Sequence, residues 1–200
     1  MQKPAKILNP VNEIIAKRWS PRALDASRPV SRSDLLSLLE AARWAPSCFG
    51  DEPWRYIVWD RFEDEASWQK AFECLVPGNQ IWAKNAPILM ISLADTLFEY
   101  NDAPNRFGQY DTGAASENLV LQAAALNLSA HQMGGFDPEK ARAAFSIPVR
   151  HVCMSMIAVG HPASPDILDA ALKEKELADR SRKPMESRFF EGSWGNPVKT

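Results

Sequence analysis

Cysteine is scarce in this chain, which holds three of them among 200 residues. Cys48, Cys74 and Cys153 are odd in number, far apart in sequence and not arranged in pairs. This spacing indicates neither a disulfide framework nor a zinc site, so we expect no metal. Unpaired cysteines are typical of a reducing compartment, and we expect the protein to be cytoplasmic.

The chain also lacks an excess of either sign of charge, because 23 lysines and arginines nearly balance 25 aspartates and glutamates, for a formal net charge of −2. Such a balance gives nucleic acid no general electrostatic attraction. No apolar run approaches the ~20 residues that span a membrane, and the first twenty residues contain no signal-peptide core. We therefore expect neither nucleic acid nor a membrane as partner. With 46% hydrophobic residues, the chain suits one domain over residues 1–200.

Several catalytic motifs are absent as well. The chain has no Gly-rich phosphate loop, no nucleophile elbow, no His-Glu-x-x-His segment and no Cys-x-x-Cys pair. Of the three histidines, His131 leads into two glycines, His151 begins a predicted strand and His161 lies in a Gly-His-Pro turn. Packing or a backbone hydrogen bond explains each position better than catalysis does. A hydrolase has no support from these residues.

The spacing of apolar residues predicts helices and strands in alternation. A short helix should end just before Arg18. A second helix should begin after Ser31, whose spacing to Asp34 is that of a helix cap, and should end before Pro46. Three more elements are predicted from their patterns: a strand over 54–60, a surface helix over 62–75 and a buried strand over 87–94.

The segment 112–126 is apolar around most of its circumference and carries few charges. A helix that is apolar on most sides is buried on most sides. The centre of the domain and a helix packed across a subunit interface both satisfy this condition, and the residues alone leave both open. The most loop-like interior segment, 100–110, comes directly before it.

A basic motif and six later pieces form a recognisable series. The motif Lys-Arg-Trp-Ser-Pro-Arg at 17–22 combines positive charge, planar guanidinium forks and a hydroxyl, which suit a phosphate or an electron-rich ring edge. Taken alone, it also fits a solvated basic turn. The other pieces lie at 45–59, 78–82, 111–126, 131–137, 159–162 and 180–184. In order and spacing, the series resembles the nitroreductase family of FMN enzymes.

The resemblance implies an α+β fold with a mostly antiparallel central sheet flanked by helices. It also implies an intertwined homodimer with two FMN sites at the subunit interface, and it favours the interface position for the helix at 112–126. The implied reaction takes hydride from NADH or NADPH to flavin N5 and then reduces an electron-poor acceptor such as a nitroaromatic or a quinone. FAD is disfavoured because the chain has no dinucleotide fingerprint.

By the same resemblance, basic residues from both ends of the chain bind the phosphate end of FMN. Arg18 and Ser20, in a segment that includes Trp19, would hold the phosphate and the ribityl chain. Arg182 and Lys183 would close on the phosphate from the far end of the chain. These five positions are the predicted phosphate site.

The resemblance assigns a second group of residues to the flavin ring. Arg22 would lie by N1 and the C2 carbonyl, where a fixed guanidinium stabilises negative charge. Asn79 would pair with the pyrimidine edge, since an amide offers both a donor and an acceptor. The backbone from Met133 through Gly134 and Gly135 would approach the ring, with an N–H directed at N5.

Two segments are expected to act across the subunit interface. Pro46, Ser47 and Cys48 would reach the flavin bound to the other subunit. The segment 185–194 carries three large aromatic residues, which a free polar tail rarely contains, and by resemblance it would add a strand to the partner's sheet.

The substrate side departs from the common family pattern. Many members carry Asn-x-Gln-Pro-Trp where this chain has Gly-Asp-Glu-Pro-Trp at 50–54, and some carry an acidic residue where it has Gly134. Trp82 occupies a region where some relatives present a lysine, so the charge near N1 rests more on Arg22. Related enzymes build a lid from the region 100–110, which makes Phe107 and Tyr110 candidates to face the substrate. Each residue taken singly also fits an ordinary loop.

Other functions remain open at this stage. The same scaffold could support enone reduction or reductive dehalogenation. The protein could also be a flavin-binding module that stores or senses redox state, or an interaction protein that keeps the fold without the flavin.

Overall fold

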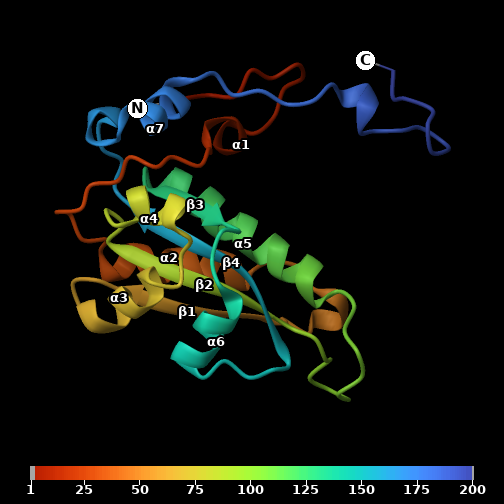
Figure 1. Cartoon of the computed structure of the whole chain (residues 1–200). Coiled ribbons are helices and arrows are strands. Elements are labelled where there is room, and N and C mark those ends of the chain that lie inside the picture. The colour runs from red at the N-terminus through yellow and green to blue at the C-terminus, as the bar shows by residue number, and fades with distance from the viewer. Residues whose placement is uncertain (1–2, 200) are drawn as a thin grey trace.

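The computed structural model describes residues 3–199 and places a four-stranded sheet at the centre of the chain (Figure 1). The strands are β1 (Trp54–Asp60), β2 (Ile88–Asp95), β3 (Ser129–Met133) and β4 (His151–Gly160). Their spatial order is β1-β2-β4-β3, and every neighbouring pair is antiparallel. The predicted α+β class with an antiparallel central sheet is confirmed.

Strand β2 forms the middle of the sheet, and all of its residues are buried. It pairs with all of β1 through Ile88 to Ala94, and with β4 across an irregularity between Ser92 and Leu93. Strand β1 has the predicted bounds, and β2 begins one residue after the prediction because Pro87 has no N–H for a ladder. Strands β1 and β3 are the outer strands of this sheet.

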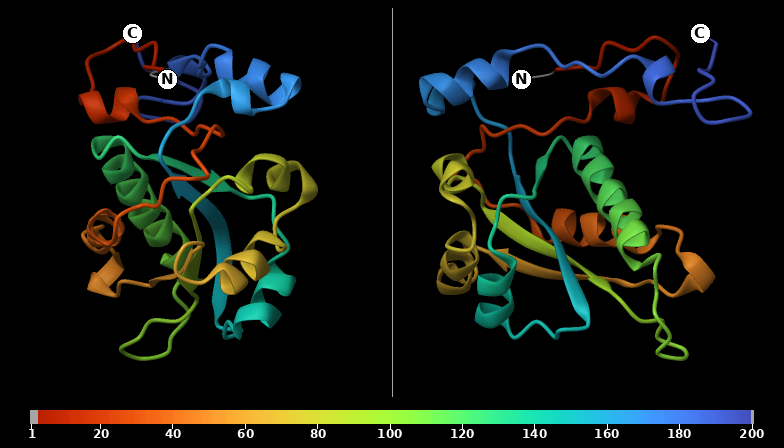
Figure 2. Two further views of the ribbon diagram at one scale, coloured as in Figure 1. Left: turned by 90° about the vertical axis from the view of Figure 1, so that its left-hand side faces the viewer. Right: turned by 45° about the vertical axis from the view of Figure 1, so that its right-hand side comes forward.

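Helices cover both faces of the sheet, and Figure 2 shows the two layers on either side of it. Helices α2 and α5 pack on one face around Leu38 and Leu119, and α3, α4 and α6 cover the other face around Trp68 and Trp82. The helices are α1 (Glu13–Lys17), α2 (Arg32–Arg43), α3 (Glu65–Phe72), α4 (Pro77–Ala83), α5 (Gly108–Ala125), α6 (Pro138–Phe145) and α7 (Ala170–Leu177). Short 3-10 turns occupy Cys48–Gly50, Pro165–Ile167 and Met185–Ser187.

The predicted helix starts are confirmed in part. Ser31 caps α2, because its hydroxyl accepts a hydrogen bond of 3.0 Å from the N–H of Asp34. The surface helix predicted at 62–75 is shorter and forms α3. The loop predicted at 100–110 is wrong at its end, because α5 already begins at Gly108 and includes Tyr110. A Cβ at Gly108 would lie 2.1 Å from the carbonyl oxygen of Asp95, so the first turn of α5 passes too close to β2 for any other residue.

The two ends of the chain lie together across one end of the sheet (Figure 1). The Arg180 guanidinium donates to the carbonyl oxygens of Lys3 and Ala16, at 2.8 and 2.9 Å. Beyond Met185–Ser187 the chain leaves the body of the molecule, and Trp194 is 91% exposed. Within residues 3–199, no helix is both long enough and apolar enough to cross a membrane.

Candidate functional site

The basic segment 17–22 begins at the last residue of α1 and lies beside the end of α5 and the start of β3. Lys17 donates from Nζ to Oδ1 of Asn127, which follows α5, at 2.7 Å. Arg18 caps α1 with an extended backbone, and its N–H donates to the carbonyl of Ile14. The Lys3 ammonium lies 4.8 Å from the centre of the Trp19 ring. The start of the segment is therefore held in place by these contacts, which also fix the backbone positions of its side chains.

Three arginines from the two ends of the chain share one region. Nε of Arg18 lies 3.4 Å from Oε1 of Glu117, yet it is buried and makes no hydrogen bond to any residue the structure describes. Burial lowers the pKa of Arg180, and the like charges of Arg18 and Arg182 lower it further. A buried donor without an acceptor, next to clustered positive charge, is suited to an anion such as phosphate.

Arg22 is held by a buried carboxylate, Glu176, on α7. The N–H of Arg22 lies 2.9 Å from one oxygen of Glu176 and 3.1 Å from the other, and the N–H of Ala23 donates to the first at 3.1 Å. The Arg22 guanidinium lies 3.9 Å from the second oxygen. The Arg22 side chain is 29% exposed and that of Glu176 only 1%. The turn that presents Arg22 is thus fixed from its buried side.

A neutral histidine supports the same turn. Nδ1 of His131, on β3, lies 3.0 Å from the carbonyl oxygen of Pro21, and its ring lies 4.6 Å from the Trp82 ring. Burial lowers the pKa of His131 to about 4, although the hydrogen bond to Pro21 acts in the opposite direction. At neutral pH the ring is therefore uncharged and donates to Pro21. Trp82 is 1% exposed and packs beneath it, so it adds no charge to the site.

Asn79 and Gly135 are in direct contact. The Asn79 side-chain N–H donates to the carbonyl oxygen of Gly135 at 2.9 Å, and the N–H of Val76 donates to the same oxygen at 3.1 Å. A Cβ at Gly135 would lie 2.8 Å from Asn79 Nδ2 and 2.9 Å from a methyl of Val76. A Cβ at Gly134 would have no heavy atom within 4 Å. Gly135 is therefore required for packing, whereas Gly134 has open space beside it.

Pro46, Ser47 and Cys48 lie away from the basic segment of their own chain. The N–H of Cys48 donates to Asp111 at 2.9 Å, in the first turn of α5, whereas Lys17 is bound to Asn127 beyond the last turn. Sixteen residues of helix rise by roughly 24 Å. Cys48 and Lys17 therefore lie near opposite ends of α5, whereas Arg18 lies 3.4 Å from Glu117, six positions after Asp111.

The remaining predicted residues differ in how exposed they are. Met133 is 3% exposed and its side chain packs in the core, so only its backbone is left to face a cofactor. Arg182 and Lys183 are exposed on the segment that follows α7, and the charge of Arg182 reaches Arg180. Trp19 and Ser20, in the basic segment, are half-buried.

Two residues of this region were missed in the sequence. Arg180 joins the ends of the chain, and Glu176 holds Arg22, although the two partners are 154 positions apart. A weak signal was present: Glu176 lies in the last turn of α7, where the helix dipole disfavours an acidic side chain.

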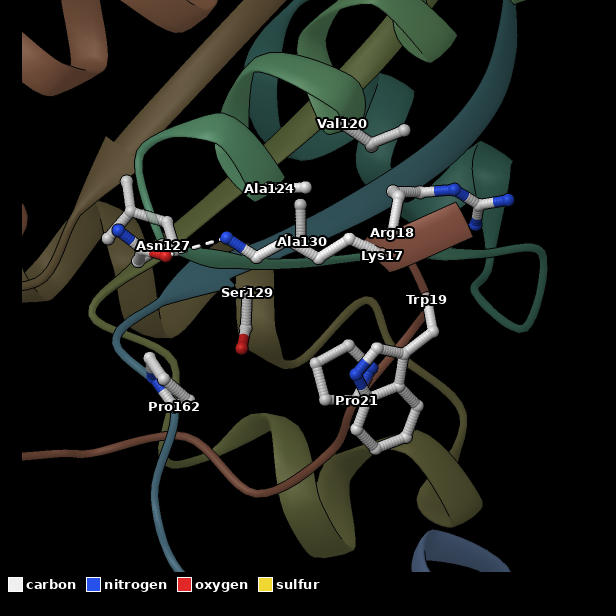
Figure 3. Close-up of a pocket in the computed structure, with 11 residues that line it drawn as sticks. Lys17, Arg18, Trp19, Pro21, Val120, Ala124, Asn127, Ser129, Ala130 and Pro162 are labelled. Atoms are coloured by element: carbon white, nitrogen blue, oxygen red, sulfur yellow. Dashed lines mark hydrogen bonds between the residues drawn. The ribbon is translucent and has the colours of Figure 1, made fainter. Parts of the chain in front are cut away.

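A hollow of about 350 Å³ lies on the α5 side of the basic segment (Figure 3). Its walls include Trp19, Val120, Ala124 and Pro162, and the Arg18 guanidinium points away from Lys17 and Asn127 in this view. Of the predicted site residues, only Arg18 and Trp19 line it. Arg22, Asn79 and Gly135 are not among its lining residues, although Pro21, next to Arg22, is.

The residues present fit the phosphate and ring of FMN on two observations. Arg18 has a buried N–H without a hydrogen bond in the described chain, and Arg18 and Arg182 are close enough to Arg180 for their charges to lower its pKa. The open space beside Gly134 lets a planar ring approach the backbone. Across residues 3–199, no group of three or more His, Cys, Asp or Glu side chains is arranged to hold a metal ion.

Comparisons with known proteins agree with a flavin site of this kind. The model of the Nitroreductase family matches residues 15–161, a range that contains Arg18, Arg22, Asn79 and Gly135 but ends before Arg180. A protein of Methanothermobacter thermautotrophicus with the provisional name NADH dehydrogenase/NAD(P)H nitroreductase is 31% identical over 157 residues, which cover 76% of this chain and 78% of that protein. NADH dehydrogenase of Thermus thermophilus is 26% identical over 166 residues, covering 68% and 78% of the two chains.

Solved structures also match. A crystal structure of an oxidoreductase containing FMN has a TM-score of 0.89 and 33% identity, with 96% of each chain covered. A nitroreductase family protein of Clostridium difficile has a TM-score of 0.70 at 20% identity, covering 92% of this chain and 99% of its own, and it shares the fold.

Proposed function

The chain belongs to the nitroreductase family and is an FMN-dependent oxidoreductase, and from this premise we propose that it passes hydride from NADH or NADPH to a small electron-poor acceptor, such as a nitroaromatic or a quinone. The observation that carries the proposal is the buried, unsatisfied Nε of Arg18 within a group of three arginines. That group needs an anion, and the phosphate of FMN supplies one.

The basic residues bind the phosphate end. Arg18 directs a buried donor to the phosphate, and Arg182 and Lys183 add charge from the exposed segment after α7. Arg180 completes the group, because its hydrogen bonds to the carbonyl oxygens of Lys3 and Ala16 hold the two chain ends together. Ser20 adds a hydroxyl to the ribityl side of the same segment.

Bound FMN supplies the redox chemistry, in which hydride enters and leaves at N5 and negative charge collects near N1. Arg22 would place a guanidinium at N1 and the C2 carbonyl, on a turn that Glu176 and His131 hold from its buried side. The neutral state of His131 and the burial of Trp82 leave Arg22 as the principal charge there. No acid, base or nucleophile of the protein is required for hydride transfer.

Asn79 and the glycine pair orient the ring. One Asn79 N–H donates to Gly135, so the second N–H and the side-chain oxygen are what Asn79 offers to the pyrimidine edge. The open space at Gly134 would allow the ring to approach the backbone, where a main-chain N–H could face N5.

A second copy of the chain completes the proposed site. Cys48 is bound to the first turn of α5, at the opposite end of that helix from Lys17. In a homodimer Pro46, Ser47 and Cys48 reach the flavin of the partner, with α5 in the interface. The exposed aromatic segment around Trp194 then packs on the partner as an additional strand.

The decisive experiment is the absorbance spectrum of purified protein, followed by quantitation of the bound cofactor. We expect about one FMN per chain and oxidation of NADH or NADPH that depends on an added nitroaromatic or quinone. Colourless protein that also fails to bind added FMN would exclude the proposal. A flavin-binding sensor gives a different result, because it binds FMN but stays reduced or reoxidises only slowly in air. Reaction with enones or halogenated substrates in place of nitroaromatics would identify the other reductase chemistries.

A further inference from the structure

The buried carboxylate of Glu176 is the strongest feature that the proposed roles leave without a function of its own. Glu176 has the lowest exposure of the charged residues described, at 1%, and it lies in the last turn of α7. Burial of a carboxylate is costly, and the helix dipole adds to the cost at this end of a helix. An acidic residue at this position therefore has a use other than the stability of α7.

The contacts of Glu176 show what that use is. All of its side-chain bonds in the described chain go to two consecutive residues: the N–H of Arg22, the N–H of Ala23 and the Arg22 guanidinium. Its own carbonyl oxygen accepts from the Lys3 ammonium at 2.6 Å, which ties α7 to the N-terminal segment. The carboxylate thus fixes the backbone from which Arg22 departs and also provides the charge nearest to its guanidinium.

We propose that Glu176 is a positioning residue for Arg22, which it holds against the flavin while partly neutralising its charge. The inference rests on the proposed function, because it needs Arg22 at N1. The two effects have opposite signs at the flavin. Placement of Arg22 raises the midpoint potential, because a fixed positive charge stabilises the anionic reduced ring, and the negative charge of Glu176 lowers it. The carboxylate therefore raises the midpoint potential through the placement of Arg22 and lowers it through its own charge.

Two substitutions separate these effects. Glu176→Gln keeps a side-chain oxygen for the N–H groups of Arg22 and Ala23 but removes the negative charge. We expect its potential to rise, with a roughly tenfold higher ratio of reduced to oxidised FMN at a fixed potential, or about 30 mV for a two-electron couple. Glu176→Ala removes both the charge and the bonds, so Arg22 is no longer held, and we expect its potential to lie below that of Glu176→Gln.

A shorter acid covers the case in which Glu176→Ala does not fold. Glu176→Asp keeps the charge but withdraws the carboxylate from both N–H groups, so we expect a potential below that of the wild type and weaker binding of FMN. Glu174→Gln is the matched control, because Glu174 is an exposed glutamate on the same helix. It should leave the potential and the dissociation constant of FMN unchanged.

The measurements are the midpoint potential of the bound flavin, the dissociation constant of FMN for the apoprotein, and the thermal midpoint of each variant. Equal potentials for Glu176→Gln and the wild type would overturn the charge effect. The positioning role would be overturned if Glu176→Gln and Glu176→Ala had equal potentials. If Glu176→Ala does not fold, equal potentials for Glu176→Asp and the wild type would overturn it. Failure of the wild type to bind FMN would instead overturn the proposed function.

Discussion

The side-chain amide of Asn79 donates a hydrogen bond of 2.9 Å to the carbonyl oxygen of Gly135, so helix α4 is joined directly to the turn that follows β3. Asn79 comes from one covering helix and Gly135 from the turn after an outer strand, and they are 56 positions apart. In the proposed site both face the flavin ring. The contact therefore sets the position of two ring-binding groups relative to each other.

The glycine pair gives the first prediction. Gly135→Ala places a methyl group 2.8 Å from Asn79 Nδ2 and 2.9 Å from Val76, so we expect it to destabilise the apoprotein by roughly 1–3 kcal/mol and to weaken FMN binding. Gly134→Ala meets no protein atom within 4 Å, so it should weaken FMN binding without loss of stability. Chemical denaturation and cofactor titration of both variants test this contrast. A Gly135→Ala variant as stable as the wild type would contradict it.

Substitution of Arg22 and of Arg18 by alanine should affect different properties of the protein. Arg22→Ala should lower the flavin potential and slow reduction by NADH or NADPH, by roughly 1–3 kcal/mol, because one charge-assisted contact to the reduced ring is lost. Arg18→Ala should mainly raise the dissociation constant of FMN. Potentiometry and stopped-flow reduction measure the first effect, and titration of apoprotein measures the second. The assignment of Arg22 fails if its variant retains FMN with the original potential and reduction rate.

Most strands and helices could be predicted because their signals are local. Strand β1 has the expected bounds, since its aromatic and β-branched residues lie between a proline and a turn. Ser31 caps α2 as its spacing to Asp34 predicts. The start of α5 could not be predicted, because it depends on the contact of Gly108 with β2, which is distant in sequence.

The residues of the candidate site could be predicted where they belong to sequence motifs. They could not be predicted where their position depends on how the elements pack. The motifs name Arg18, Arg22 and Asn79, whereas the buried position of the Met133 side chain depends on which face of β3 meets the core. Glu176 was missed for a related reason, because its purpose appears only when α7 lies against the turn at Arg22.

The neutral state of His131 predicts a dependence of stability on pH. Its pKa is about 4 in the folded protein, against an ordinary value of 6.5, so between these values the unfolded chain binds the extra proton more readily. Stability should therefore fall as the pH drops from about 6.5 to about 4, by up to roughly 3 kcal/mol from this residue. Denaturation of apoprotein across this range measures the loss.

Other groups also titrate in this range, so the comparison with a variant is decisive. His131→Gln keeps a donor for the Pro21 carbonyl but cannot gain a charge, and its stability should change less between pH 6.5 and 4 than that of the wild type. His161→Gln, at a turn outside the site, controls for the loss of a histidine. Parallel curves for the wild type and His131→Gln would show that His131 is not buried in its neutral form.

Two truncations separate the phosphate contacts of the C-terminal segment from its proposed contacts with a second copy. A chain that ends after Asp179 lacks Arg180, Arg182 and Lys183 together with the exposed aromatic residues, and we expect it to lose FMN and to become monomeric or aggregate. A chain that ends after Pro184 keeps the three basic residues and the bonds from Arg180 to Lys3 and Ala16. It should bind the phosphate end of FMN better than the shorter chain but still lose the dimer, because Phe189, Phe190 and Trp194 are removed. Light scattering and cofactor content distinguish these outcomes. If the chain that ends after Asp179 remains a yellow dimer of unchanged stability, the segment is a dispensable appendage, and Arg182 and Lys183 do not bind the phosphate.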